Sequence, residues 1–212
     1  MGSEMCIRDR DEYHPYEDLP KMINPTSGYI FNTNNSPFNS TAEFENLKEE
    51  DYNSTFSFME EENNRSVRFM ELIDDYEKLS YEDFKDIKYD QQYPDSILYI
   101  GNISQIFDLD KSEFPSYENL IDLIQKWDRR GDIENIGAAQ WSLYYSYMLD
   151  VLSENDLSVK DTIDIKFHLD ALEKTKDHLM KNFEKLDIRL GDIQRLVRGD
   201  ESLPVSGLID MI

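Results

Sequence analysis

Cysteine is almost missing from this 212-residue sequence, and long apolar runs are missing altogether. The single cysteine, Cys6, cannot form a disulfide within the chain. Apolar runs extend for only a few residues, whereas a membrane-spanning helix needs roughly 20. The sequence also has no Gly-rich phosphate-binding loop, CxxC pair or internal repeat. These absences exclude a disulfide-linked scaffold and the common nucleotide-binding motifs, and no segment is expected to cross a membrane.

Basic residues are scarce: 22 Lys and Arg face 45 Asp and Glu, which gives a formal charge of -23. Because phosphate binding needs clustered Lys and Arg, this balance argues against a nucleic-acid partner and against docking on an anionic membrane. The acidity is typical of a solvated surface. A substrate that carries positive charge is the alternative.

The apolar residues suffice for a core, and most of them recur at helical spacing. They predict helices over residues 65–79, 95–107, 117–127, 136–152 and 161–183. Ser80 and Asp83 predict a capped short helix through Ile87. Glycines and a proline after residue 186 predict a return to strand and loop. We therefore expect an α+β fold, largely helical, with strands near both ends.

Residues 24–38 contain the densest run of asparagine in the sequence. A turn at residues 24–28 precedes a short apolar strand, Tyr29 to Phe31, and the strand leads into Asn32 to Ser36. Two interpretations are open. Side-chain amides at a strand end can donate hydrogen bonds to a developing negative charge, as an oxyanion hole requires. Asparagine and serine are also common in turns because they tolerate left-handed backbone.

Three stretches resemble the penicillin acylase family of N-terminal-nucleophile hydrolases, which includes penicillin, aculeacin and acyl-homoserine-lactone acylases. They occur in the family's order and span most of the chain from about Asp11. The stretches are Leu19-Pro20 with Asn24-Pro25-x-Ser27-Gly28-Tyr29-Ile30-x-Asn32-x-Asn34-Asn35-Ser36-Pro37; Leu123-Ile124-Gln125-Lys126-Trp127-Asp128 with Gly137-Ala138-Ala139; and Leu190-Gly191-Asp192-Ile193-Gln194-Arg195 with Leu203-Pro204-Val205-x-Gly207.

The resemblance implies a piece of an αββα sandwich and an acyl-enzyme mechanism that uses an N-terminal serine. It implies that Asn34 donates its side-chain amide to the oxyanion, and that Arg65 orients Asn34. Arg68 is the alternative to Arg65, because the preceding loop can shift the alignment by one helical turn. An exposed arginine without a role in the site is a further possibility.

The resemblance also sets expectations for the rest of the enzyme. Residues 1–10 do not follow the family pattern, and we predict a non-native leader there, followed by the C-terminal part of the acylase β-chain at 11–212. The nucleophile would then be missing, and the α-chain and upstream β-chain would be partners. No cofactor is expected in this portion, although upstream residues of the family can hold a structural calcium. Relatives are usually exported, which implies the periplasm or the exterior.

Substrate class is open among penicillin-like, acyl-homoserine-lactone and lipopeptide amides. In most relatives a tryptophan precedes the Gly-Asp pair and a histidine often follows it, where this chain has Leu190 and Gln194. These departures bear on the substrate subclass. A function of another class, a non-catalytic acidic helical binding module, is the alternative.

Two further patterns bear on a ligand pocket and on a metal site. Trp141, Tyr144, Tyr145 and Tyr147 form an aromatic helical stripe, which either lines an acyl pocket or, as is more common, belongs to a core. His168 and His178 lie ten residues apart and share no helical face at three- or four-residue spacing, so a metal site built on them is not expected.

Overall fold

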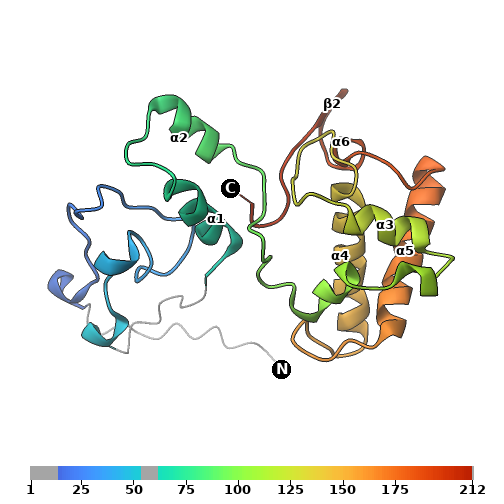
Figure 1. Cartoon of the computed structure of the whole chain (residues 1–212), viewed down its shortest axis with the longest axis horizontal. Helices are drawn as coiled ribbons and strands as arrows, with labels where there is room; N and C mark the ends of the chain where they lie inside the picture. Colours follow the sequence, from blue (N-terminus) through green and yellow to red (C-terminus); the bar gives the residue numbers. More distant parts are fainter. Residues whose placement is uncertain (1–13, 54–61, 212) are drawn as a thin grey trace. The chain divides into compact units, whose positions relative to one another are not determined.

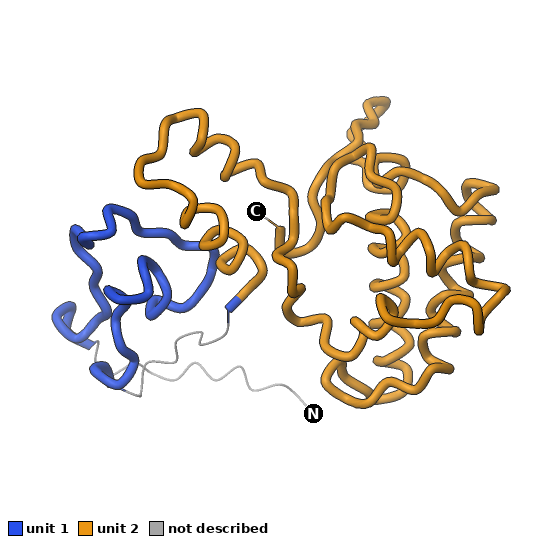
Figure 2. Tube along the Cα trace, viewed as in Figure 1, with its two compact units in different colours: residues 1–62 blue, residues 63–212 orange. Residues whose placement is uncertain are grey.

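The structure, a computed structural model, describes residues 14–53 and 62–211. The predicted leader, residues 1–10, and Cys6 lie outside the described residues. The chain divides into two compact units, residues 1–62 and 63–212 (Figure 2). Figure 1 shows the helices and strands of both units.

The first unit is mainly loop, with three short 3₁₀ helices: η1 (Tyr16–Asp18), η2 (Glu43–Glu45) and η3 (Glu49–Asp51). Two of these, η2 and η3, follow the asparagine-rich stretch. The predicted strand from Tyr29 to Phe31 is wrong, because no strand is formed by the described residues of this unit.

Side-chain hydrogen bonds replace a strand ladder in this region. The Phe31 N–H donates to the Ser40 carbonyl at 2.9 Å, but the Tyr29 carbonyl accepts from Thr41 Oγ1 at 2.8 Å instead of from a backbone N–H. Asn46 Oδ1 accepts from the N–H groups of Ser40 and Thr41. Two segments therefore lie side by side, but side chains take part in the hydrogen bonds where a ladder would use backbone groups alone, so no ladder forms.

The second unit begins with two helices whose starts were predicted correctly. Helix α1 (Asn64–Ile73) follows an Asn63 cap that forms a capping box with Ser66. Helix α2 (Tyr81–Lys88) has the predicted cap, in which Ser80 Oγ accepts from the Asp83 N–H and Asp83 accepts from the Ser80 N–H.

The helix predicted at residues 95–107 is a shorter 3₁₀ helix, η4 (Gly101–Phe107). Gly101 has a φ of +49°, and a Cβ at this position would lie 2.2 Å from the Val159 carbonyl oxygen. The backbone must therefore turn sharply at Gly101, which prevents an α-helix from continuing across it. A second short 3₁₀ helix, η5 (Lys111–Glu113), follows.

The core of the second unit is helical. It is built by α3 (Glu118–Gln125), α4 (Ala138–Glu154) and α5 (Ile165–Phe183), and α4 and α5 lie side by side (Figure 1). These helices confirm three of the predicted elements to within a few residues. Their fully buried side chains include Leu120, Ile121, Ile124, Tyr144, Met148, Leu172 and Leu179.

Gly137 makes the close approach of α4 to the end of α3 possible. Its φ is +104°, and a Cβ there would lie 2.9 Å from Trp127 Cβ and 3.0 Å from the Leu123 carbonyl oxygen. Ala138 and Ala139 follow with no exposed surface. The Gly-Ala-Ala motif thus has a packing reason, since larger residues would push α4 away from α3.

The chain ends in a short helix and a hairpin, which confirms the expected return to strand and loop. Helix α6 (Leu190–Ile193) leads into β1 (Arg195–Arg198), which pairs antiparallel with β2 (Glu201–Pro204) so that Arg195 lies opposite Pro204. The α+β, largely helical prediction is confirmed. Among the described residues, no helix has the length and apolar character needed to cross a membrane.

Candidate functional site

The asparagine-rich stretch forms a compact turn built from its own side chains. Asn32 Oδ1 accepts from the Asn34 N–H at 2.8 Å, and Asn35 Oδ1 accepts from the Thr33 N–H at 2.7 Å. The Asn35 amide also donates to the carbonyl oxygens of Ser36 and Asn39. Asn32 and Asn35 therefore serve the turn itself, as the turn interpretation predicts.

Asn34 lies at the tip of this turn and is exposed. Its φ of +65° is in the left-handed region, which few residues other than glycine and asparagine adopt easily. Turn chemistry thus explains why an asparagine is tolerated at this position. The Asn34 backbone N–H is used to close the turn, and the turn fixes the position from which the side chain extends.

Arg65 lies in the first turn of α1, where Asp210 holds it. The Asp210 carboxylate accepts from Arg65 Nε at 2.9 Å and from the Asn64 N–H at 2.8 Å. A carboxylate at a helix N-terminus satisfies an otherwise unpaired backbone donor and interacts favourably with the helix dipole. Asp210 therefore caps α1 and fixes the guanidinium of Arg65 through the same two oxygens.

Arg68, the alternative to Arg65, is bound on three sides within the second unit. Its Nε and Nη2 donate to the two oxygens of Asp90 at 2.9 and 3.1 Å, and its Nη1 donates to Glu71 at 3.0 Å. The Asp90 hydrogen bonds are the main reason that the pKa of Arg68 is raised. This geometry is that of a structural ion pair between α1 and the chain after α2.

Asn34 belongs to the first unit and Arg65 to the second. The predicted contact between these two residues stays a prediction.

The aromatic stripe of α4 has two faces with different surroundings. Tyr144 is fully buried and shares a 2.6 Å hydrogen bond with His168 Nδ1, while Tyr147 shares a 2.8 Å hydrogen bond with His178 Nδ1. Burial lowers the pKa of His168 to about 4. This face is core, as one of the two interpretations predicts.

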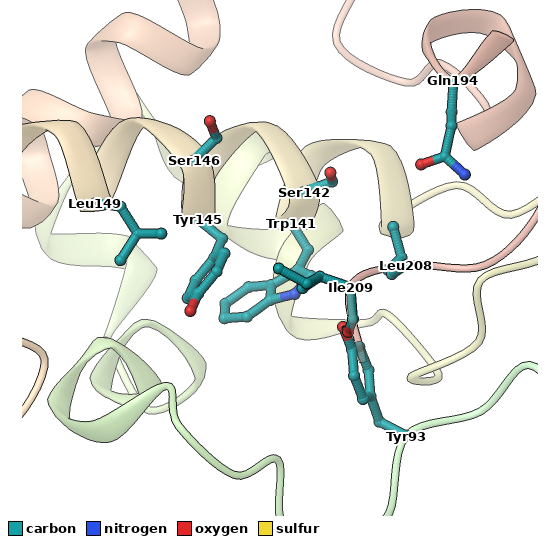
Figure 3. A pocket seen from close by; sticks show the side chains of 9 residues that line it. All are labelled: Tyr93, Trp141, Ser142, Tyr145, Ser146, Leu149, Gln194, Leu208 and Ile209. Carbon is teal, nitrogen blue, oxygen red and sulfur yellow. The ribbon is translucent and has the colours of Figure 1, made fainter. Parts of the chain in front are cut away.

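Trp141 and Tyr145, on the other face, line a pocket of about 310 Å³ (Figure 3). Tyr93 from the loop after α2, and Leu208 and Ile209 from the C-terminal segment, complete its apolar wall. The Tyr93 hydroxyl donates to the Ile209 carbonyl, and burial, together with the negative charge of Asp210, raises the pKa of that hydroxyl.

Two contributions to these sites were missed in the sequence. Asp210 pairs with Arg65 across 145 positions, and Tyr93 meets Ile209 across 116. No local pattern marks either pair, because both depend on how the C-terminal segment returns to the start of the unit. In the described ranges, 14–53 and 62–211, no cluster of three or more His, Cys, Asp or Glu residues is arranged to hold a metal ion.

The sequence matches the Penicillin amidase family over residues 4–200, which is most of the chain. The match includes the asparagine-rich turn, the start of α1 and all three helices of the core. The chain therefore belongs to the penicillin amidase family, a family of amide hydrolases.

The structure gives the third motif a clear structural role. At Gly191 a Cβ would lie 3.0 Å from the Ile133 carbonyl oxygen and 3.0 Å from Pro204 Cβ, so a side chain there would separate α6 from its neighbours. Gln194, at a position where the resemblance implies that histidine is common, donates from Nε2 to the carbonyl oxygens of Val205 and Gly207. A neutral imidazole offers a single donor, so Gln194 makes two backbone bonds that a histidine cannot both make.

Proposed function

We propose that this chain forms part of an acylase, in which Asn34 supplies a donor of the oxyanion hole and Arg65 positions Asn34. The family match over residues 4–200 carries this proposal. The nucleophile is an N-terminal serine supplied by a segment other than the described residues. Its α-amine acts as the general base.

In the proposed reaction the serine oxygen attacks the amide carbonyl and its proton passes through the α-amine to the leaving nitrogen. The carbon–nitrogen bond breaks, the amine leaves and an acyl-ester remains, which water then hydrolyses to a carboxylic acid and free serine. Negative charge develops on the carbonyl oxygen in both halves of the reaction. A fixed, uncharged amide donor such as that of Asn34 stabilises this charge without being titrated.

The turn geometry supports Asn34 over its neighbours. Asn32 and Asn35 both use their side chains to close the turn. Asn34 contributes its backbone N–H to the turn and is exposed at its tip. An oxyanion donor must be held by its surroundings and still be accessible to the substrate, and an exposed residue on a hydrogen-bonded turn is compatible with both requirements.

The ion pairs support Arg65 over Arg68 as the positioning residue. Arg68 donates from all three of its nitrogen atoms to Asp90 and Glu71. Asp210 orients Arg65 by accepting a hydrogen bond from its Nε. A guanidinium is a planar fork of several donors, so an arginine that a carboxylate orients can also donate to a carbonyl acceptor such as that of an asparagine side chain.

The experiment is a steady-state assay of the processed enzyme that contains this chain, with penicillin-like, acyl-homoserine-lactone and lipopeptide amides as substrates. Asn34→Gly keeps the left-handed backbone and removes only the side chain. We expect it to lower kcat on the order of a hundredfold or more, as the loss of one oxyanion donor does. Asn24→Gly is the matched control, because Asn24 also has a positive φ of 51° in the same unit, and we expect it to keep wild-type turnover.

Normal turnover in Asn34→Gly would exclude the assignment. For Arg65→Ala we expect kcat to fall while KM changes little, with partial recovery in Arg65→Lys. If Arg65→Ala kept full kcat and Arg68→Ala lost it, the positioning role would belong to Arg68. The 212-residue chain alone is expected to hydrolyse none of these amides, and hydrolysis by it would contradict a nucleophile supplied from elsewhere. We further propose that the enzyme acts in the periplasm or outside the cell.

A further inference from the structure

The pocket beside α4 has a preformed wall of packed aromatic rings. The Trp141 ring stacks on the rings of Trp127 and Tyr145, with centroid distances of 5.6 and 5.5 Å. The Phe107 ring lies against it in a tilted arrangement, with a centroid distance of 4.9 Å. Trp141 itself is only 3% exposed. Because the ring is held by three neighbours, the pocket exists before any ligand enters, which lowers the entropic cost of binding.

One polar group of this wall has no protein partner in the described part of the chain. The indole N–H of Trp127 donates to the Arg130 carbonyl at 2.8 Å, whereas the indole N–H of Trp141 donates to none of the described residues. Figure 3 shows the Trp141 nitrogen on the side of the ring that faces Ile209. This N–H is not one of the fully buried donors without a partner among the described residues, so it can be reached, and the acceptor atom of a ligand can bind to it.

The rest of the lining selects by charge and size. No Lys, Arg, His, Asp or Glu is among the residues that line the pocket. A charged ligand would therefore lose hydration without gaining a partner, and an anion would also be repelled by the formal charge of -23. A volume of about 310 Å³ lies at the lower end of the roughly 300–1,000 Å³ of ligand pockets. It suits a single ring with one small substituent.

We propose that this pocket binds a neutral, single-ring aromatic molecule whose carbonyl oxygen accepts the hydrogen bond of the Trp141 indole N–H. The ring contacts Tyr145, Ile209 and Leu149, and no bond is made or broken. An aromatic ring is favoured over a saturated one because the edge of an indole is electropositive and the face of an aromatic ring is electronegative. The site involves neither Asn34 nor Arg65, so it goes beyond the proposed acylase activity.

The test uses the full 212-residue chain, labelled with ¹⁵N, and benzamide as the probe. The chain has two tryptophans and hence two indole N–H resonances, which Trp127→Phe assigns. Benzamide is expected to shift the Trp141 resonance in a saturable manner and to leave the Trp127 resonance in place. Cyclohexanecarboxamide should bind several-fold more weakly, and benzoate at least about tenfold more weakly, which corresponds to 1.4 kcal/mol.

A pair of matched variants separates this pocket from general surface binding. Ser146 lines the pocket on α4, and Ser146→Phe should weaken benzamide binding at least about tenfold by filling the space. Ser153 is an exposed serine of the same helix outside the pocket, and Ser153→Phe should leave binding unchanged. The proposal is overturned if the Trp141 resonance shows no saturable shift, if benzoate binds as well as benzamide, or if Ser146→Phe binds as the wild type does.

Discussion

The two compact units of this chain are stabilised by different interactions. In the second unit, three packed helices bury a continuous apolar core. Among the described residues of the first unit, Phe31 alone is a buried apolar side chain. Its segments are connected by hydrogen bonds that Glu45 and Asn46 accept and Thr41 donates. Large apolar side chains of that unit, such as Ile23 and Phe44, are 75% and 79% exposed.

This difference determines how sensitive each unit is to substitutions and to pH. An apolar core tolerates changes at its surface, whereas a network of hydrogen bonds depends on each member and on its protonation state. The proposed oxyanion donor, Asn34, lies in the unit that depends on polar bonds. Three predictions test whether the two units differ as described. The two tryptophans make fluorescence a reporter of the second unit alone, because both lie within it.

The largest effect is expected from truncation of the helical core. Leu172 on α5 has no exposed surface, and Leu172→Ala should lower the free energy of unfolding by about 2–5 kcal/mol through lost burial and a residual cavity. Tryptophan fluorescence during urea unfolding measures this change in the free energy of unfolding. The same substitution at Leu196, which is 48% exposed on β1, should change the free energy by less than about 0.5 kcal/mol. Equal effects at both positions would contradict the assignment of the core.

Protonation of His168 should produce the next largest effect. Burial lowers its pKa from 6.5 to about 4, so between these values the unfolded chain binds a proton that the folded unit does not. Stability from this source is complete above pH 6.5 and falls by ~3 kcal/mol as the pH drops towards 4. Unfolding followed by fluorescence at several pH values measures the slope.

His168→Gln should flatten that slope, and His178→Gln controls for the loss of one histidine from the same helix. A wild-type slope in His168→Gln would show that another group titrates in this range.

The smallest effect is expected in the first unit, at Glu45. Its carboxylate accepts from Thr26 Oγ1 at 2.6 Å and from the N–H groups of Thr26 and Ser27 at 2.7 and 2.6 Å. These hydrogen bonds lower the pKa of Glu45 below its ordinary value of 4.5, and the bond from the Thr26 hydroxyl has the largest effect. Their stabilisation is therefore complete above pH 4.5 and is lost as the pH falls through the lowered pKa.

The amide proton shifts of Thr26 and Ser27, followed by NMR from pH 6 to 2, should report this titration. Glu45→Gln should abolish the pH dependence and increase the hydrogen exchange of both amides, while Glu43→Gln removes the same charge two residues away as the control. A titration midpoint at or above 4.5 in the wild type would rule out the proposed role of these bonds.

Local patterns predicted the parts of the fold that local patterns control. The caps at Ser80 and Asp83 and the apolar stripes of α3, α4 and α5 depend on residues a few positions apart. The strand predicted from Tyr29 to Phe31 failed because a strand needs a backbone partner, and Thr41 supplies a hydroxyl in its place. The α-helix predicted at residues 95–107 failed because the distant Val159 carbonyl determines the backbone at Gly101.

The candidate site follows the same division. The asparagine turn and the position of Arg65 at the start of α1 were visible in the sequence. Asp210, which orients Arg65, and the pocket formed by Tyr93, Trp141 and Ile209 were not visible, because their members come from separate parts of the chain. Periodicity also could not decide which face of the α4 aromatic stripe is core and which is open, since both faces carry aromatic residues.

The bonds made by the C-terminal segment have a consequence for the order in which the second unit folds. Helices α3, α4 and α5 are close in sequence and can pack on one another while the chain is still being synthesised. Asp210 on Arg65, Ile209 on Tyr93 and Ser206 on Gln91 each join positions more than a hundred residues apart. Asn63 caps α1 locally, but Asp210 can accept from the Asn64 N–H and orient Arg65 only after residue 210 has left the ribosome. The support for the proposed oxyanion donor is therefore assembled later than the helical core of the same unit.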